Sequence, residues 1–278
     1  AIRREEAPSG YSELTREDIE RKPATSLAEL LGDTPGVAVD NEQGGRSQIR
    51  IRGFEPSQSL ILINGRRINN TAELVGHSDF RLTQMPTAAI ERVEVVRGPL
   101  STLYGSDALG GVVNVIVQPP EDEWTGRVQT RLGVTDPRPG GEERNVSVYT
   151  AGPLGEDTGA LFSLDLLDRD GSLNPDEPGV DEIEGREGDD DTRRVDIFRY
   201  SSGGRYDFEL GHWEGRADVY RSRSETEAPH LNREEQHTDD IVDLSVSRYW
   251  GQAHQLTLGV DYRREDFWRD REGERQVG

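Results

Sequence analysis

The stretch IERVEVVRGPLSTLYGSDALGGVVNVI, residues 90–116, constrains the fold of this chain more than any other. It contains two runs rich in Val and Ile, separated by a segment rich in glycine. Such runs are typical of β-strands, and the glycine and proline residues between them predict turns. Together with IRIRGFEPSQSLILINGRRI at 49–68, this stretch predicts a compact N-terminal domain built on a β-sheet.

Two short helices are predicted before these strands. Thr15 begins the sequence TRED, which resembles a capping box at the start of a helix. Either Ser26 or Thr25 can cap a second helix, which contains the sequence LAELL. Residues 1–120 are therefore expected to fold as a small α+β domain.

After residue 120 the pattern changes to a series of amphipathic strands. Apolar and polar residues alternate there with a period of two, so each strand has one apolar and one polar face. In the last segment the apolar face consists of Leu256, Leu258, Val260 and Tyr262. Seven such segments are predicted: 128–134, 145–151, 161–167, 195–201, 216–222, 241–247 and 255–262.

The predicted connections alternate between long and short. We expect loops at 135–143, 168–193 and 225–238, and short turns near 153–159, 208–213 and 251–252. This alternation is typical of an outer-membrane β-barrel, and it places Trp124, Trp213 and Trp250 together at the short-turn end, as in an interfacial aromatic girdle. A soluble β-sandwich is the alternative. A barrel that encloses a domain of this size needs about 22 strands, so seven would form only part of its wall.

Composition excludes several classes of protein. No segment reaches the roughly 18–20 consecutive apolar residues of a membrane-spanning helix. The net charge is −21, and most of it lies after residue 120, which disfavours binding to nucleic acid. There is no cysteine, no HExxH and no phosphate-binding loop, so we expect a protein without enzymatic activity or a covalent cofactor. The start, AIRREEAPSG, lacks an apolar signal-peptide core, and we expect any such peptide to have been removed.

Four segments support a family resemblance: IRIRGF, SLILINGRRIN, HSDFRLTQMP and the stretch at 90–116. They resemble the plug domain of TonB-dependent outer-membrane receptors, and most of all the colicin I receptor group, which imports iron bound to catecholate siderophores. The resemblance implies a plug domain at 1–120, followed at 121–278 by the N-terminal part of an antiparallel transmembrane β-barrel.

The resemblance also implies a function and partners. Such receptors of the Gram-negative outer membrane bind a ferric siderophore and import it with energy from the TonB complex. The Ton box that contacts this complex is not found in the sequence, and we expect it upstream of the first residue. The alternatives are a cobalamin or haem receptor of the same family, or a soluble binding module that retains a plug-like domain.

Candidate ligand-binding residues lie in two polar segments of the plug, 41–48 and 69–81. A ferric catecholate is an aromatic trianion, so Arg46 and Arg81 could meet its charge and His77 could stack on it or donate a hydrogen bond. For each of them, the alternative is an ordinary solvated or structural side chain.

Two further sets of residues are expected to bind charged groups. The resemblance implies that Arg52 and Arg97 pair with glutamates of the barrel. Asp168, Asp170 and Asp176 carry hard oxygen ligands at short spacing and are a candidate calcium site, as in some vitamin-transporting members of the family. The spacing differs from that of an EF-hand, and a solvated acidic loop is the alternative.

Overall fold

The computed structural model contains three β-sheets and short helices. It describes residues 10–22, 24–42, 46–67, 86–100, 104–105, 108–120, 122–134, 141–170, 196–228, 233–250, 254–271 and 274–277. Among these residues, no helix is long and apolar enough to cross a lipid bilayer.

The N-terminal unit, residues 10–118, contains a five-stranded sheet in the order β1-β6-β7-β4-β5 and a separate hairpin of β2 and β3. Strands β4 and β7 run parallel, and the other pairs are antiparallel. The predicted strands are confirmed, whereas β1 and β5 were not predicted. The strands are β1 (Tyr11–Leu14), β2 (Val37–Glu42), β3 (Arg46–Ile51), β4 (Ser59–Ile63), β5 (Arg66–Arg67), β6 (Ile90–Arg97) and β7 (Gly111–Val117).

Both predicted helices are present and begin at the expected caps. Helix α1 (Arg16–Arg21) has a complete capping box, in which Thr15 and Asp18 each accept a hydrogen bond from the other's backbone N–H. Helix α2 (Leu27–Leu31) is capped by Ser26, whose side chain accepts a hydrogen bond from the backbone N–H of Glu29. Two 3-10 turns, η1 (Pro56–Gln58) and η4 (Thr87–Ala89), lead into β4 and β6. Because the helices are short, we attribute their stability to packing rather than to intrinsic propensity.

A second, eight-stranded sheet, the long sheet, follows in the order of the chain, and every neighbouring pair is antiparallel. Each of the seven predicted segments overlaps one of its strands, and β15 is an additional one. The predicted loop at 225–238 is wrong, because the flanking strands extend to Ala228 and start again at Arg233. The strands are β8 (Thr125–Gly133), β9 (Glu143–Gly155), β10 (Thr158–Arg169), β11 (Asp196–Leu210), β12 (Trp213–Ala228), β13 (Arg233–Trp250), β14 (His254–Arg271) and β15 (Glu274–Val277).

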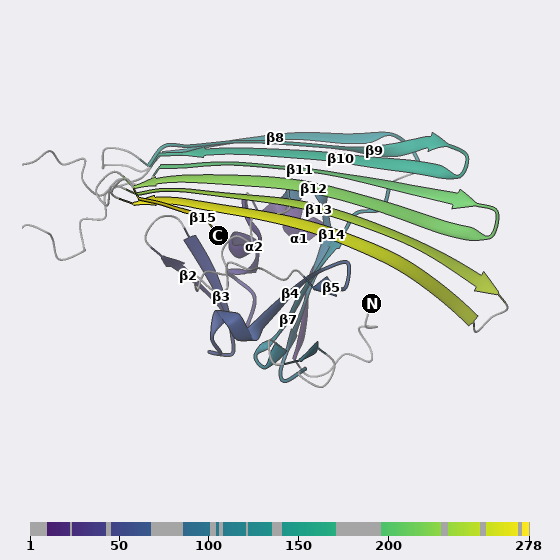
Figure 1. The fold of residues 1–278 in the computed structure, drawn as a ribbon, viewed down its shortest axis with the longest axis horizontal. Helices are drawn as coiled ribbons and strands as arrows, with labels where there is room; N and C mark the ends of the chain where they lie inside the picture. The colour runs from purple at the N-terminus through teal and green to yellow at the C-terminus, as the bar shows by residue number, and fades with distance from the viewer. Residues whose placement is uncertain are drawn as a thin grey trace, which may run out of the picture.

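The N-terminal unit packs against one face of the long sheet, which we call the inner face (Figure 1). The hydrophobic core of the unit is continuous with this face: Tyr149, Ala151, Leu161 and Tyr220 of the sheet belong to the same buried cluster as the leucines of α2 and the valines of β6 and β7. The two parts therefore share one core, although they belong to different sheets.

The glycine-rich segment before β7 has a steric role. A Cβ on Gly111 would lie 2.4 Å from the carbonyl oxygen of Val96, and one on Gly110 would lie 2.9 Å from the Cβ of Phe54. Real Cβ atoms do not approach that closely, so we assign these glycines to close packing of the backbone rather than to ligand contact.

Candidate functional site

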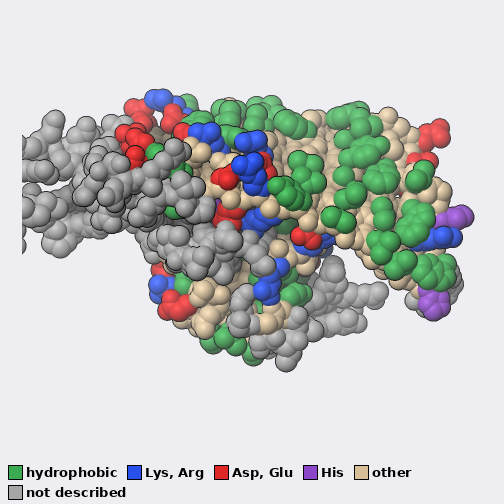
Figure 2. Space-filling view, in the orientation of Figure 1, with side chains coloured by type: hydrophobic (Ala, Val, Ile, Leu, Met, Phe, Trp, Pro, Cys, Tyr) green, Lys and Arg blue, Asp and Glu red, His purple; other side chains and the backbone are tan. Residues whose placement is uncertain are grey.

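The long sheet has an exposed, apolar outer face and a buried inner face with many polar residues. A soluble protein has the reverse arrangement. On the outer face the side chains of Leu258 and Val260 are 54% and 70% exposed, and the apolar residues of the neighbouring strands are exposed with them. Figure 2 shows these hydrophobic side chains spread over the outside of the sheet. The inner face instead buries polar residues of β9 to β13: Asn145, Ser147, Ser163, Asp165, Arg199, Ser201, Arg205, Asp218, Ser222, His237 and Asp239.

The three tryptophans predicted to share one end of the sheet do so. Trp124 lies just before β8, Trp213 begins β12 and Trp250 ends β13. This is the end at which residues 156–157 and 211–212 form the short connections. Trp124 and Trp250 are 58% and 48% exposed, so their rings can contact whatever surrounds the outer face.

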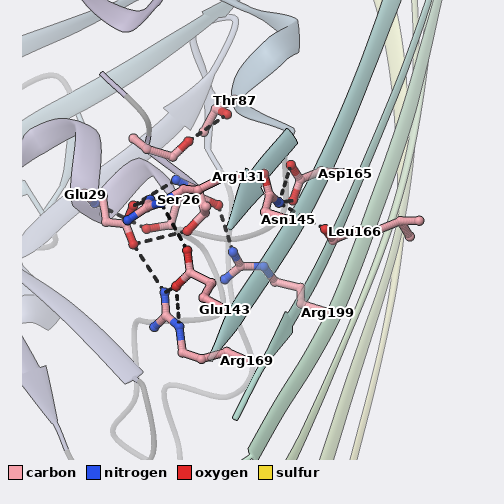
Figure 3. A network of polar contacts seen from close by, with 12 residues as sticks. Ser26, Glu29, Thr87, Arg131, Glu143, Asn145, Asp165, Leu166, Arg169 and Arg199 are labelled. Atoms are coloured by element: carbon pink, nitrogen blue, oxygen red, sulfur yellow. Dashed lines mark hydrogen bonds and ion pairs between the residues drawn. The ribbon is translucent and has the colours of Figure 1, made fainter. Parts of the chain in front are cut away.

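A network of ion pairs centred on Glu29 joins the N-terminal unit to the inner face (Figure 3). Glu29 of α2 contacts Arg131 of β8 at 3.3 Å and Arg169 of β10 at 3.5 Å. Both arginines also contact Glu143 of β9, so two positive and two negative charges meet. Partial burial opposes ionisation of Glu29, but the backbone N–H of Thr25 and the charges of Arg131 and Arg169 outweigh it, and the pKa of Glu29 lies below its ordinary value.

Two buried arginines of β11 bind backbone carbonyl groups of the N-terminal unit. Arg199 donates to the carbonyl oxygen of Thr25 at 2.7 Å, just before α2. Arg205 donates to the carbonyl oxygens of Val117 and Gln118 at 3.0 and 2.8 Å, where β7 ends. A buried guanidinium needs a carboxylate to offset its desolvation, and Asp218 supplies one for Arg205 at 2.8 Å. These contacts fix both α2 and the last strand of the N-terminal unit to the sheet.

Two further ion pairs join the N-terminal unit to the sheet. Arg127 of β8 pairs with Glu20 of α1, and Arg66 of β5 pairs with Asp243 of β13. The positive partner therefore comes mostly from the sheet, and the N-terminal unit supplies carboxylates and carbonyl groups.

Arg52 and Arg97, predicted to pair with glutamates of the barrel, lie close together in the N-terminal unit. Arg97 donates to Ser12 Oγ and to the carbonyl oxygen of Pro35, both at 2.7 Å. Arg52 has a left-handed backbone, with φ of 54°, and this is rare for a residue other than glycine and costs free energy. Their pairing with barrel carboxylates stays a prediction.

The predicted ligand-binding and calcium-binding residues are only partly described. The backbone of Arg46 begins β3, but its side chain lies outside the part of the chain that the structure describes, as do His77, Arg81 and Asp176. Asp168 is exposed near the end of β10, 3.8 Å from Arg144. Asp170 follows β10, and its backbone N–H donates to the carbonyl oxygen of Glu142 at 2.8 Å. Ligand binding and calcium binding at these residues stay predictions.

The sequence analysis missed the residues that form the interface, namely Glu29, Arg131, Arg169, Arg199 and Arg205. One signal could have found two arginines of the sheet, because Arg199 lies between Phe198 and Tyr200, and Arg205 lies next to Tyr206. The strand period then predicts that they point inward. Their partners could not be predicted in the same way.

Comparisons with known proteins agree with this arrangement. Residues 3–112 match the family model of the TonB-dependent Receptor Plug Domain. An iron-regulated outer membrane virulence protein of Vibrio cholerae is 37% identical over 153 residues, which are 54% of this chain and 23% of that protein. The ferric enterobactin receptor PirA of Pseudomonas aeruginosa is 34% identical over 159 residues, 53% of this chain and 21% of that protein. The chain thus spans less than a quarter of the length of these relatives.

Solved structures show the same fold. The crystal structure of a mutant ferric enterobactin receptor (PfeA) from Pseudomonas aeruginosa, in complex with enterobactin, matches 94% of this chain and 41% of its own, with a TM-score of 0.75 and 21% identity. The siderophore receptor PirA from Acinetobacter baumannii matches 95% of this chain and 45% of its own, with a TM-score of 0.65 and 19% identity.

Proposed function

We propose that this chain, whose residues 3–112 are a TonB-dependent receptor plug domain and whose later strands form an incomplete antiparallel β-barrel, belongs to an outer-membrane receptor that imports a ferric siderophore. The plug family consists of receptors and transporters, not enzymes. The relatives named for iron regulation and for ferric enterobactin support iron as the cargo.

The observation that carries this proposal is the reversed polarity of the long sheet. Its exposed apolar residues point away from the plug, and its buried polar residues, with a few apolar ones such as Tyr149 and Leu161, point toward it. A lipid-facing wall around a plugged, hydrated lumen has this arrangement. A soluble sandwich would instead bury its apolar face against a second layer, so the exposed apolar surface argues against the soluble module.

We propose residue 120 as the boundary between plug and barrel. The change of sheet between β7, which ends at Val117, and β8, which begins at Thr125, supports this division. Arg205 binds the carbonyl groups of Val117 and Gln118, and this contact would hold the end of the plug in place while other parts move.

The polar interface suits a plug that must be displaced. Separating two apolar surfaces in water costs about 25 cal/mol for each Å² exposed, whereas partly exposed ion pairs are worth only about 0–1 kcal/mol each because water replaces the partner. The contacts of Glu29 with Arg131 and Arg169 are of this second kind, since all three side chains are about a third exposed. We propose that force from the TonB complex breaks these pairs first.

For the cargo we propose a catecholate siderophore, with Arg46, His77 and Arg81 as ligand-binding residues. Its negative charge and aromatic rings suit two guanidinium groups and an imidazole. Calcium binding at Asp168, Asp170 and Asp176 is retained as a separate proposal, in which the ion would order the loop after β10.

Tryptophan fluorescence of the receptor in detergent tests the cargo. We expect saturable quenching by a ferric catecholate, and a roughly tenfold weaker affinity when Arg46 and Arg81 are both replaced by Ala, because about 1.4 kcal/mol of charge-assisted bonding corresponds to that factor. Arg144→Ala removes an exposed arginine of β9 and is the matched control. Saturation by cobalamin or haem alone would reject the siderophore, and a folded monomer without detergent would favour the soluble module.

A further inference from the structure

A compact cluster of metal-ligand side chains lies on the inner face of β13 and β14, away from the ion pairs of the plug. It consists of His237, Asp239 and Glu265, whose side chains are 3%, 1% and 8% exposed. Asp239 and Glu265 are directly opposite each other in the register of the two strands, and His237 is two residues from Asp239 on the same face. Neither the predicted function nor the family resemblance uses these three residues.

The donor atoms have the spacing of a metal site. His237 Nε2 is 2.8 Å from Asp239 Oδ2 and 3.7 Å from Glu265 Oε1, and the three donor atoms all lie within 4.8 Å of one another. Ligands placed tetrahedrally at about 2.0–2.1 Å from Zn²⁺ lie about 3.3 Å apart, so small side-chain rotations bring all three atoms to a common metal. A fourth position would remain for water or another ligand.

The charge of the cluster, with two carboxylates, suits a cation. Two buried carboxylates directly opposite each other repel, and Arg263 supplies one positive charge by donating to Asp239 Oδ1 at 3.0 Å. On the other neighbouring strand, β12, the residues opposite Asp239 and His237 are Ser222 and Ser224, which carry no charge.

The surroundings orient the ligands. Arg263 takes one oxygen of Asp239 and leaves Oδ2 directed at His237, as outer hydrogen bonds orient carboxylate ligands in metal sites. The ring of Phe267 lies 6.4 Å from the ring of His237 and shields one side of the cluster from water.

We propose that His237 Nε2, Asp239 Oδ2 and Glu265 Oε1 bind a first-row divalent transition metal, for which Zn²⁺ is the probe. One imidazole and two carboxylates favour such an ion over Ca²⁺, which takes six to eight oxygen ligands. The bound metal would join β13 to β14.

Metal titration of the full chain in detergent, after treatment with a chelator, tests this proposal. We expect one saturable Zn²⁺ site by calorimetry, an absorption spectrum of low-coordinate cobalt when Co²⁺ is used, and a rise in Tm with either ion. Ca²⁺ at the same concentration should not displace Zn²⁺ or Co²⁺ from this site.

Matched variants assign the site. Glu265→Gln and His237→Ala should each weaken Zn²⁺ binding at least about tenfold and abolish the cobalt spectrum. Asp266→Asn changes the next residue of β14, an exposed aspartate paired with Arg264, and should leave binding unchanged. If His237→Ala does not fold, the nearly isosteric Glu265→Gln decides. Absence of saturable binding by the unmodified chain, or equal binding by Glu265→Gln and Asp266→Asn, overturns the proposal.

Discussion

Two ion pairs between β11 and β12 show how environment decides the role of a residue. Arg205 is directly opposite Asp218, and Asp207 is directly opposite Arg216, so the same pair occurs twice on the same two strands. The side chains of Arg205 and Asp218 are 2% and 5% exposed, whereas those of Arg216 and Asp207 are 43% and 28% exposed. Only the first pair also binds the end of the plug.

Replacing Arg205 or Arg216 by methionine should therefore lower the free energy of unfolding by different amounts. We expect Arg205→Met to lower the free energy of unfolding by about 3–5 kcal/mol, because Asp218 and two carbonyl groups lose a buried donor. Arg216→Met should cost about 0–1 kcal/mol, because water screens that pair. Urea denaturation of both variants measures the difference. Equal losses would mean that Arg205 is not a buried anchor of the plug.

The lowered pKa of Glu29 predicts a dependence on pH. A carboxyl group whose pKa is lower in the folded state stabilises the fold above the ordinary pKa of Glu, about 4.3, and this contribution is lost as the pH falls through the lowered value. Glu29→Gln should thus destabilise the plug at pH 7, by less than about 1 kcal/mol for a partly exposed pair, and have a smaller effect near pH 3, where the unfolded chain is already mostly protonated at this residue.

Thermal unfolding at the two pH values measures this change. Glu17→Gln is the control, because Glu17 lies on α1, where its salt bridge is with Arg21 of the same helix, and its side chain is 72% exposed. If Glu29→Gln changes the stability by the same amount at both pH values, the charge of Glu29 does not stabilise the fold.

At the scale of elements, the strands are longer than the sequence pattern indicates. Residues 255–262 are the alternating part of β14, which continues to Arg271. The added residues are rich in charge, and alternation of apolar with polar residues no longer marks them. The strand continues because its backbone pairs with β13 over its whole length, and hydrogen bonding does not require apolar side chains.

The two faces of β14 should respond differently to charge. Leu258→Arg places a charge on the apolar outer face and should cost up to about 2–4 kcal/mol, whereas Thr257→Arg, on the inner face, should be tolerated. The amount of folded receptor in the outer-membrane fraction of an expressing cell reports this difference. If both variants accumulate to the same level, the outer face does not contact lipid.

At the scale of the whole molecule, the plug and the sheet contact each other through separable polar contacts and one shared core. The chain contains no cysteine, so a pair of introduced cysteines can be linked selectively. Glu29 and Arg131, which pair across the interface, are suitable positions.

Linking Glu29→Cys to Arg131→Cys with a short reducible reagent should abolish uptake of ferric siderophore and leave its binding intact, because the plug can no longer move from the wall. Reduction should restore uptake. In the control, Asp207→Cys and Arg216→Cys are linked within the sheet, where these residues are opposite each other on β11 and β12, and uptake should continue. Uptake at the full rate by the linked first variant would show that α2 need not leave the wall.

The sequence by itself determined much of the local structure: both helix caps, the strands of the plug other than β1 and β5, and the seven amphipathic segments with their apolar and polar faces. These follow from periodicity and capping, which depend on neighbours in the chain. Only the tertiary structure decided which polar residues meet. Arg199 binds the carbonyl of Thr25, 174 residues away, and His237 of β13 lies 3.7 Å from Glu265 of the neighbouring strand β14. Such contacts depend on strand register and on the docking of the plug, and both result from packing of the whole chain.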